Sequence, residues 1–333
     1  MSESEEEDLM QTLYPEFNES LMVCLPKQAV DADEDGQEVY DPEGTRPLNI
    51  TNADNRIIAN AVRLKIEPML DGIISKTQRG FVGGRSMAAN IIDLDEAMAR
   101  TATTQEEGGA VFFDFAAAFP SVSHKFMIDY LRRSGHIPEH VLRYIERLYV
   151  GNRCKIFFGG SYHEGFAQTA GIRQGCPLSP ILFALCNDLL LKRIQHVLPE
   201  STTTRGYADD LAVVLAKLKR ELKVLEQLFE EFERLSGLLL HHGKSVIVPL
   251  FKTEIDKLRE EIHEQVATWA DFSISFTAKY LGIFLGPERK ELSWDKPMKK
   301  VIDRAKTWGD IGGGQLISIQ ALHGVRPFFR GSV

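Results

Sequence analysis

An α+β fold is predicted for this chain by three features of its sequence. Segments with the 3.6-residue apolar period of a helix occur beside short, almost continuously apolar segments typical of buried strands. The two kinds intermix without the regular strand–helix–strand repeat of a doubly wound parallel sheet. Hydrophobic residues make up 44% of the 333 residues, which is enough for a core and too much for global disorder.

The first ordered elements are expected to be helices on both sides of a glycine-rich loop. Apolar residues recur at helical spacing over 55–70, namely Ile58, Val62, Ile66 and Met69. The loop at 72–86 contains QRGFVGGRS, and a second helix is expected over 87–101.

The period changes to that of a strand after Gly108. Residues 110–115 predict a buried strand that ends near Asp114, because the segment is almost wholly apolar. Further along we expect helices over 123–133, with Ser123 as the N-cap, and over 138–149. A β-hairpin of 154–158 and 162–168 around Gly159-Gly160 follows, and then a buried helix over 180–197.

The last predicted elements surround the clearest helix of the sequence. Two short strands in 203–215 are expected to turn at 208–210. Leucine and phenylalanine line one face of 218–235, and Gly237 ends that helix. Strands are also expected at 245–249 and 280–285.

The net charge of −8 at first argues against a nucleic-acid partner. The charge is uneven, because residues 1–45 hold 14 acidic residues and one basic residue, a charge of −13. The remaining 38 basic and 33 acidic residues give +5. We therefore expect an acidic, partly disordered segment at 1–45, with order beginning near Arg46. The charge argument against a nucleic-acid partner therefore applies to residues 1–45 and not to the rest of the chain.

Neither membrane insertion nor secretion is indicated. The longest apolar runs are far too short to span a bilayer, and the acidic N-terminus differs from a signal peptide. Four cysteines are scattered without a CxxC pair, as in the reduced thiols of an intracellular protein, at Cys24, Cys154, Cys176 and Cys186.

Carboxylates stand at the ends of two predicted strands, Asp114 in VFFDFAAAF and Asp209-Asp210 in GYADDLAVV. A carboxylate among aromatic residues costs desolvation energy unless it is paired or bound to a metal. No lysine or arginine lies within four residues of Asp114, and clustered carboxylates suit Mg²⁺. Adjacent strand residues point to opposite faces, so Asp209 and Asp210 serve one site only at a turn, or if one does most of the ligation. The plainer alternative is a capped turn.

The order of three motifs resembles the palm of reverse transcriptases. They are FDFAAAF around Asp114, GIRQGCPLSP at 171–180 and YADD at 207–210. A closer resemblance is to the enzymes of non-LTR (LINE-type) retrotransposons. Those enzymes carry segments similar to RPLNITNADNRIIANAVRLKIEPML (46–70), QRGFVGGRS (78–86), SGLLLHHGKS (236–245) and YLGIFLG (280–286). The resemblance covers roughly 20–286.

The resemblance implies a polymerase right-hand fold, with an antiparallel palm sheet packed on helices and partial fingers. Fingers and palm would occupy 46–286. Residues 287–333, with nine basic and five acidic residues, would begin a thumb that is cut short. We expect no endonuclease domain in a chain of this length.

The same resemblance implies a catalytic set. Asp114 and Asp209 would bind two Mg²⁺ ions, with Mn²⁺ as an alternative, and Asp210 would be the weaker third acid. The backbone carbonyl of Phe115 would complete one metal shell. Lys244 matches a lysine that protonates the leaving pyrophosphate. A surface lysine is the plainer alternative for it.

Residues for nucleotide and template are also implied. Phe119 matches an aromatic steric gate that excludes a ribose 2′-hydroxyl, against the alternative of a core phenylalanine. Gln174 and Gly175 match a loop that contacts the nucleotide and the template, against the alternative of a plain helix entry. Arg46 and Arg56 match residues that hold the triphosphate. Arg79 and Arg85 would contact template phosphates.

The function implied is that of an RNA-directed DNA polymerase core, with an RNA template, a DNA primer and dNTPs as partners. A nuclear role follows from the family. Two alternatives stay open, a degenerate nucleic-acid-binding fragment without turnover, and an RNA-dependent RNA polymerase, which would lack the aromatic gate. One departure from the family is Ala116–Ala118, where a basic residue is common, and it bears on template or nucleotide contacts.

Overall fold

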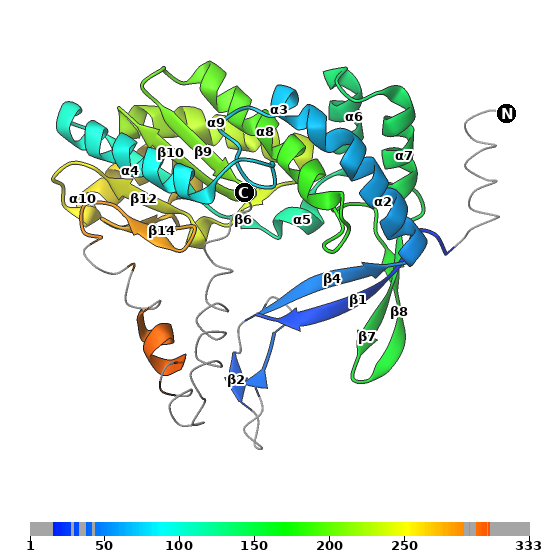
Figure 1. Cartoon of the computed structure of the whole chain (residues 1–333). Coiled ribbons are helices and arrows are strands. Elements are labelled where there is room, and N and C mark those ends of the chain that lie inside the picture. The colour runs from blue at the N-terminus through cyan, green and yellow to red at the C-terminus, as the bar shows by residue number, and fades with distance from the viewer. Residues whose placement is uncertain are drawn as a thin grey trace. The chain divides into compact units, whose positions relative to one another are not determined.

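The computed structural model describes residues 16–27, 30–32, 38–41, 44–289, 293, 298–304 and 306 (Figure 1). The chain divides into two units. Unit 1 is drawn from Met1–Ser75, Ala116–Leu189 and Glu231–Leu239. Unit 2 is drawn from Lys76–Phe115, Leu190–Glu230 and Leu240–Val333. Each unit contains a sheet of its own.

The sheet of unit 1 has the strand order β4-β1-β7-β8. Strand β1 (Glu19–Pro26) pairs antiparallel with β4 (Thr45–Thr51) and parallel with β7 (Arg153–Phe158), which forms a hairpin with β8 (Ser161–Ala167). The prediction that order begins near Arg46 is therefore wrong. Strand β1 lies among acidic and turn-forming residues, and only its pairing with two distant strands reveals it.

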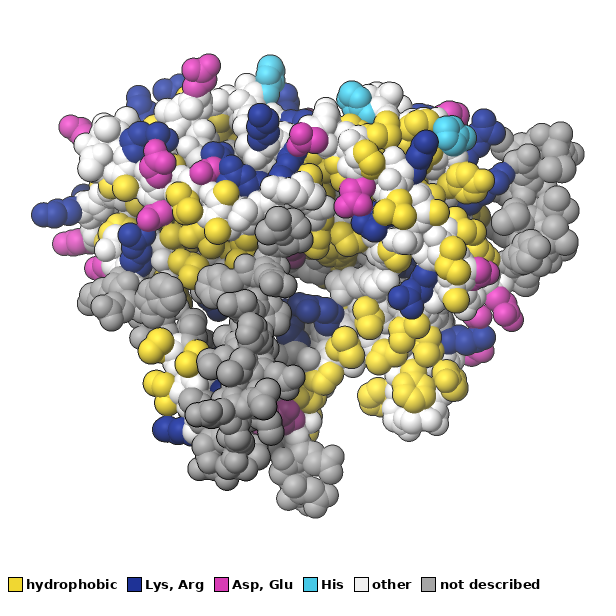
Figure 2. Space-filling model, in the orientation of Figure 1, with side chains coloured by type: hydrophobic (Ala, Val, Ile, Leu, Met, Phe, Trp, Pro, Cys, Tyr) yellow, Lys and Arg dark blue, Asp and Glu magenta, His cyan; other side chains and the backbone are white. Residues whose placement is uncertain are grey.

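The β7–β8 hairpin carries exposed apolar side chains. Strand β8 is exposed along its whole length, and the exposed fractions reach 73% at Phe158 and 71% at Tyr162. Figure 2 shows apolar side chains gathered over the end of this hairpin. The turn itself is Gly159-Gly160, as predicted.

The helices of unit 1 follow the predicted apolar periods. Helix α2 (Ala53–Ile66) continues into η2 (Glu67–Met69) and α3 (Leu70–Ile73), so the predicted 55–70 helix is confirmed for most of its length. Helix α6 (His124–Ser134) begins as predicted, because Ser123 Oγ accepts a hydrogen bond from Phe126 N–H at 3.3 Å. The remaining elements are α5 (Ala118–Ser121), α7 (Glu139–Tyr149) and the short strands β2 (Asp31–Ala32) and β3 (Glu38–Val39). Helix α8 (Ser179–Val197), which belongs to unit 1 up to Leu189 and to unit 2 from Leu190, confirms the buried helix predicted over 180–197.

The sheet of unit 2 has the order β13-β12-β5-β10-β9. Strand β5 (Gly109–Phe113) is central and pairs antiparallel with β10 (Asp210–Leu215) and β12 (Val246–Pro249). Strand β9 (Thr203–Tyr207) is antiparallel to β10, and β13 (Ser273–Ile274) is parallel to β12. The predicted antiparallel sheet is thus confirmed, with one parallel edge pair.

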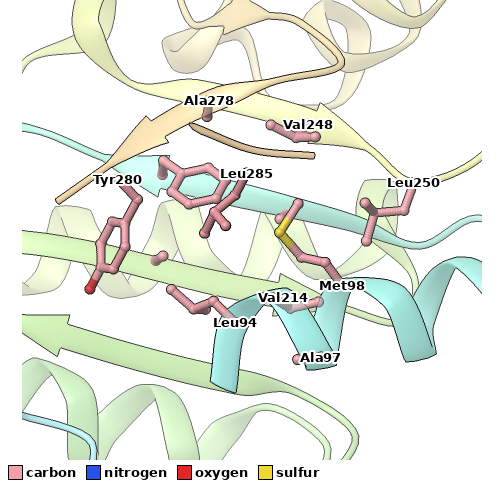
Figure 3. Close-up of a cluster of buried hydrophobic side chains, with 12 residues drawn as sticks. Leu94, Ala97, Met98, Val214, Val248, Leu250, Ala278, Tyr280 and Leu285 are labelled. Atoms are coloured by element: carbon pink, nitrogen blue, oxygen red, sulfur yellow. The ribbon is translucent and has the colours of Figure 1, made fainter. Parts of the chain in front are cut away.

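Both faces of this sheet are covered, which explains why every residue of β5 is buried. On one face Phe112 belongs to a cluster with Leu94 and Met98 of α4 (Met87–Thr104) and with Tyr280 (Figure 3). On the other face the ring of Phe113 stacks on Phe229 of α9 (Leu218–Ser236), with 4.4 Å between ring centroids. Alternate residues of the apolar strand therefore enter two different clusters.

Several short elements complete the described chain. They are β6 (Phe115–Ala116), β11 (Leu239–Leu240), η3 (His242–Lys244), α10 (Ile255–Gln265) and η4 (Ala267–Trp269). The single strand predicted over 280–285 is instead the hairpin of β14 (Ala278–Tyr280) and β15 (Ile283–Leu285). Leu281 and Gly282 turn the chain there with φ of 49° and 88°. Most of the predicted thumb, 287–333, lies outside the described residues. In the part that is described, no helix is long and apolar enough to cross a bilayer.

Candidate active site

Asp114 directly follows the central strand β5, and a turn at 241–245 holds its backbone from both sides. His241 N–H donates to the carbonyl of Asp114 at 2.8 Å, and Asp114 N–H donates to Ser245 Oγ at 3.2 Å. The Ser245 hydroxyl donates in turn to the carbonyl of His241 at 3.1 Å. With its backbone tied on both sides, the half-buried carboxylate leaves the sheet at a fixed point.

Asp209 lies in a two-residue hairpin turn, and Asp210 is the first residue of the strand after it. Tyr207 pairs with Asp210, so Ala208 and Asp209 are the two turn residues between β9 and β10. Ala208 has a left-handed backbone with φ of 58°, whereas Asp209 does not have a positive φ. This is the pattern of a type II′ turn, in which the first central residue is left-handed. The turn supplies the condition under which adjacent aspartates can serve one site.

The strand register brings the two acidic positions together. Leu211 of β10 pairs with Phe113 of β5. Continuing this antiparallel register by one residue sets Asp210 opposite Asp114. Asp209 precedes it at the turn. All three carboxylates therefore belong to one end of the β5–β10 pair, within unit 2.

The pKa of Asp210 reflects its proximity to Asp209 and Asp114. Its pKa is raised to about 6, first by desolvation and then by the negative charges of Asp209 and Asp114. Like charges held near one another are the environment that a bound cation would relieve.

The donor atoms and the charge of the three aspartates suit a divalent metal ion. The donors are carboxylate oxygens, which Mg²⁺ prefers, and the negative charges of Asp209 and Asp114 both act on Asp210. Among the residues that the structure describes, however, no three His, Cys, Asp or Glu side chains gather closely enough to hold an ion. The donor type and the charge fit a divalent cation, while the three side chains do not converge on a single point.

Lys244 and Phe115 lie in the same unit as the three aspartates. Lys244 is exposed at the end of η3 and immediately precedes Ser245, the residue that accepts the Asp114 N–H. Phe115 is buried next to Asp114. Sequence reasoning selected Lys244 in this segment and missed His241 and Ser245. The only sequence signal for these two residues was their position in HHGKS, the motif that contains Lys244.

Three nucleotide-binding candidates lie in unit 1. The Phe119 ring is half-buried and stacks on Phe183 of α8, with 4.4 Å between centroids and 16° between planes. The carbonyl of Gln174 accepts a hydrogen bond from Asn49 N–H at 2.8 Å. Gly175 has φ of 113°, and a Cβ there would lie 2.7 Å from the carbonyl oxygen of Asn49. The close backbone approach predicted for Gly175 is therefore, in this structure, an approach to strand β4.

The candidate arginines differ in their surroundings. Arg46 on β4 and Arg56 on α2 are both exposed. By contrast, Arg79 donates to the Asp93 carboxylate at 2.7 Å, and Arg85 donates to the backbone carbonyl of Gln78 at 2.6 Å. The two arginines of the glycine-rich loop are thus engaged within unit 2, and their contact with template phosphates stays a prediction.

Residues 26–285 match the family described as reverse transcriptase (RNA-dependent DNA polymerase). The chain belongs to this family. It is 26% identical over 256 residues to the transposon TX1 uncharacterized 149 kDa protein of Xenopus laevis, covering 74% of this chain and 19% of that protein. It is 29% identical over 265 residues to a Pol polyprotein of the R2 retrotransposable element of Nasonia vitripennis, covering 74% of this chain and 24% of that protein. A third relative, the R2DM Pol polyprotein of Drosophila melanogaster, is 27% identical over 212 residues. This match covers 62% of this chain and 20% of that protein.

These relatives confirm the predicted resemblance to non-LTR retrotransposon proteins, and the chain spans about a quarter of their length or less. Solved telomerase structures from Candida tropicalis have a similar fold. One, in complex with a TWJ fragment of telomeric RNA, has a TM-score of 0.56 at 10% identity and covers 86% of this chain and 48% of that one. The other, an apo form truncated from the C-terminal domain, has a TM-score of 0.57 at 11% identity, with 84% and 57% covered. The predicted polymerase right-hand fold is confirmed.

Proposed function

We propose that this chain carries out RNA-directed DNA synthesis at the end of the β5–β10 pair, with Asp114, Asp209 and Asp210 holding two Mg²⁺ ions there. The strand register places these three aspartates at one end of the β5–β10 pair, and the charges of Asp209 and Asp114 help to raise the pKa of Asp210. This arrangement is the observation that supports the site within a reverse transcriptase fold. Mn²⁺ has the same preference for oxygen ligands and is an alternative.

When bound, the ions would supply charge neutralisation and activation of the primer 3′-hydroxyl. Asp114 and Asp209 would be the principal ligands, with Asp210 as the weaker third acid and the Phe115 carbonyl as a backbone ligand. The hydrogen bonds from His241 and to Ser245 hold Asp114 before substrate arrives, so less reorganisation is needed during the reaction.

Other residues would bind the substrates. Guanidinium groups at Arg46 and Arg56 suit the triphosphate, because their planar donors match phosphate oxygens. Gln174 and Gly175 would contact nucleotide and template, and Phe119 would leave no room for a ribose 2′-hydroxyl. These roles are proposals about unit 1.

Lys244 would donate a proton to the leaving pyrophosphate. An exposed lysine within the turn that holds the Asp114 backbone has the positive charge that this role requires. The partners proposed are an RNA template, a DNA primer and dNTPs. Because the relatives are proteins of retrotransposable elements, we propose that the protein acts in the nucleus, where an element is copied into chromosomal DNA.

Primer extension tests this function directly. The purified chain with an RNA template, a DNA primer, Mg²⁺ and dNTPs should extend the primer, and Asp114→Asn should abolish extension. Asp271→Asn, which changes an exposed aspartate of unit 2, is the matched control and should leave extension intact. No extension with template binding intact would instead favour a non-catalytic binding protein.

Nucleotide choice separates the two polymerase alternatives. The wild-type chain should prefer dNTPs, and Phe119→Ala should relax that preference by removing the ring below the sugar. A preference of the wild type for rNTPs would contradict the proposal and favour an RNA-dependent RNA polymerase.

A further inference from the structure

The turn that carries Asp209 contains a residue in an unfavourable backbone conformation. Ala208 has φ of 58° and is buried. A left-handed backbone costs a non-glycine residue about 1–2 kcal/mol, so it persists only where the surroundings determine it. Part of that determination must come from outside the turn.

One side chain, Gln78, hydrogen-bonds to both backbone groups of Ala208. The N–H of Ala208 donates to Gln78 Oε1 at 3.0 Å, and Gln78 Nε2 donates to the carbonyl of Ala208 at 3.2 Å. Gly80 N–H donates to the same Oε1 at 2.9 Å. The side chain has no exposed surface. A carboxamide combines the acceptor and the donor that a single backbone residue requires.

The backbone around Gln78 seats the hairpin as well. Gly206 N–H donates to the carbonyl of Thr77, and Arg79 N–H donates to the carbonyl of Gly206, each at 2.9 Å. A Cβ on Gly80 would lie 2.0 Å from the Ala208 nitrogen, so only glycine permits this approach. Residues 77–80 therefore fit against the turn through both backbone and side chain.

A second buried amide supports the same hairpin from α4. Asn90 Nδ2 donates to the carbonyl of Gly206 at 2.9 Å and to the hydroxyl of Tyr280 at 3.2 Å. The Tyr280 hydroxyl donates to the carbonyl of Asp210 at 3.4 Å. Both strands that flank the turn thus have polar support, and the Gln78 side chain reaches the left-handed residue itself.

We propose that Gln78 is a positioning residue, which fixes the Ala208 turn and thereby the placement of the Asp209 and Asp210 carboxylates. This inference rests on the proposed function of those carboxylates. Gln78 acts on the backbone of the turn and not on the reacting atoms. A misplacement of about 1 Å can cost about 100-fold in rate, so loss of this support lowers turnover more than substrate binding.

The test replaces Gln78 with methionine, which has similar size and lacks both hydrogen-bonding groups. In Gln78→Met we expect kcat for primer extension to fall about 100-fold, with the Kd for template–primer within threefold of wild type. Amide hydrogen exchange at Ala208 should quicken at least tenfold. An unchanged exchange rate, or a kcat within threefold of wild type, would overturn the proposal.

A second substitution tests the cause of the defect. Adding Ala208→Gly to Gln78→Met should restore kcat at least tenfold, because glycine adopts a positive φ without help from a neighbour. Absence of rescue would show that Gln78 does not act by holding the turn. If Gln78→Met fails to fold, Gln78→Asn retains the amide, is too short to reach Ala208, and should give the same results.

A matched control separates positioning from general destabilisation. Asn55→Leu removes a fully buried amide that donates to the carbonyl of Phe17 and to Asn18 Oδ1, each at 3.0 Å. It should lower Tm and leave both kcat and Ala208 exchange near wild type. An equal loss of kcat in this control would assign the effect of Gln78→Met to stability and overturn the proposal.

Failure of the proposed function would be recognised separately, because wild type itself would then make no DNA. In that case Mn²⁺ binding, followed by electron paramagnetic resonance, decides the inference. Binding weakened at least tenfold in Gln78→Met would support placement of the carboxylates by Gln78, and unchanged binding would overturn it.

Discussion

The hairpins β7–β8 and β9–β10 both reverse the chain with two residues, but the two turns are specified differently. Gly159 and Gly160 have φ of 57° and 76°, and nothing lies within 4 Å of a Cβ built at either. The other turn uses Ala208 and Asp209, and its left-handed residue is an alanine held by Gln78. A turn that only reverses the chain is specified by its own residues. The β9–β10 turn, which places the Asp209 carboxylate, depends on hydrogen bonds with Gln78, a residue 130 positions away from Ala208 in the sequence.

The largest effect should come from removing a carboxylate from the β9–β10 turn. Asp209→Asn is expected to reduce primer extension at least about 1,000-fold, or about 4 kcal/mol in barrier height, because a neutral amide is a poor ligand for a divalent cation. Glu164→Gln, on exposed strand β8 of the other hairpin, is the control. Similar losses in both variants, measured as kcat, would remove the distinction between the hairpins.

The next largest effect tests the packing behind the β9–β10 turn. Gly80→Ala should destabilise the protein by about 3 kcal/mol or more, because its Cβ would lie 2.0 Å from the Ala208 nitrogen and backbone must move. Gly83→Ala in the same loop should change stability by less than about 0.5 kcal/mol, since nothing lies within 4 Å of that Cβ. Urea unfolding measures both. Equal values would show that the loop does not seat the hairpin.

A smaller effect should appear in the pH dependence of stability. The pKa of Asp210 is raised from 3.8 to about 6, so its charged form is disfavoured in the folded state. Above pH 6 this penalty is complete. As the pH falls from about 6 to about 4, the folded state takes up a proton before the unfolded state does, and the penalty is lost.

Metal-free wild type should therefore gain stability relative to Asp210→Asn as the pH is lowered from 7 to 5. The measurement is Tm by calorimetry in EDTA, with Asp271→Asn as the control for an exposed aspartate of the same unit. Parallel curves for wild type and Asp210→Asn would contradict the raised pKa.

The smallest effect is expected in the glycine turn. Gly160→Asn should change stability by less than about 0.5 kcal/mol and leave primer extension unchanged, because asparagine tolerates a left-handed backbone and the site is open. A large loss of stability or activity would mean that this turn also depends on contacts outside itself.

The same contrast explains what could be predicted from sequence. The Gly159-Gly160 turn, the Ser123 N-cap and the strand before Asp114 depend on neighbouring residues, and all three are found in the structure. The β9–β10 strands were predicted as well, because their apolar residues mark a buried pair.

The remaining features depend on distant partners. Strand β1 has an ordinary apolar segment, but its acidic surroundings suggest disorder when the sequence is considered alone. Its order comes from pairing with the distant strands β4 and β7. The support of Asp114 by Ser245 joins residues 131 positions apart. Gln78 resembles any polar loop residue until its amide is seen against Ala208. Nothing in a single sequence records which distant backbone group a buried amide contacts.

The central claim is that the end of β5 and the β9–β10 turn bring three carboxylates into one charged site. Nuclear magnetic resonance titration of the Asp210 carboxyl group measures this directly. In metal-free wild type it should titrate near pH 6, and its pKa should fall both in Asp114→Asn and on addition of Mg²⁺. A pKa in the ordinary range near 4, unchanged by that substitution and by Mg²⁺, would contradict the claim.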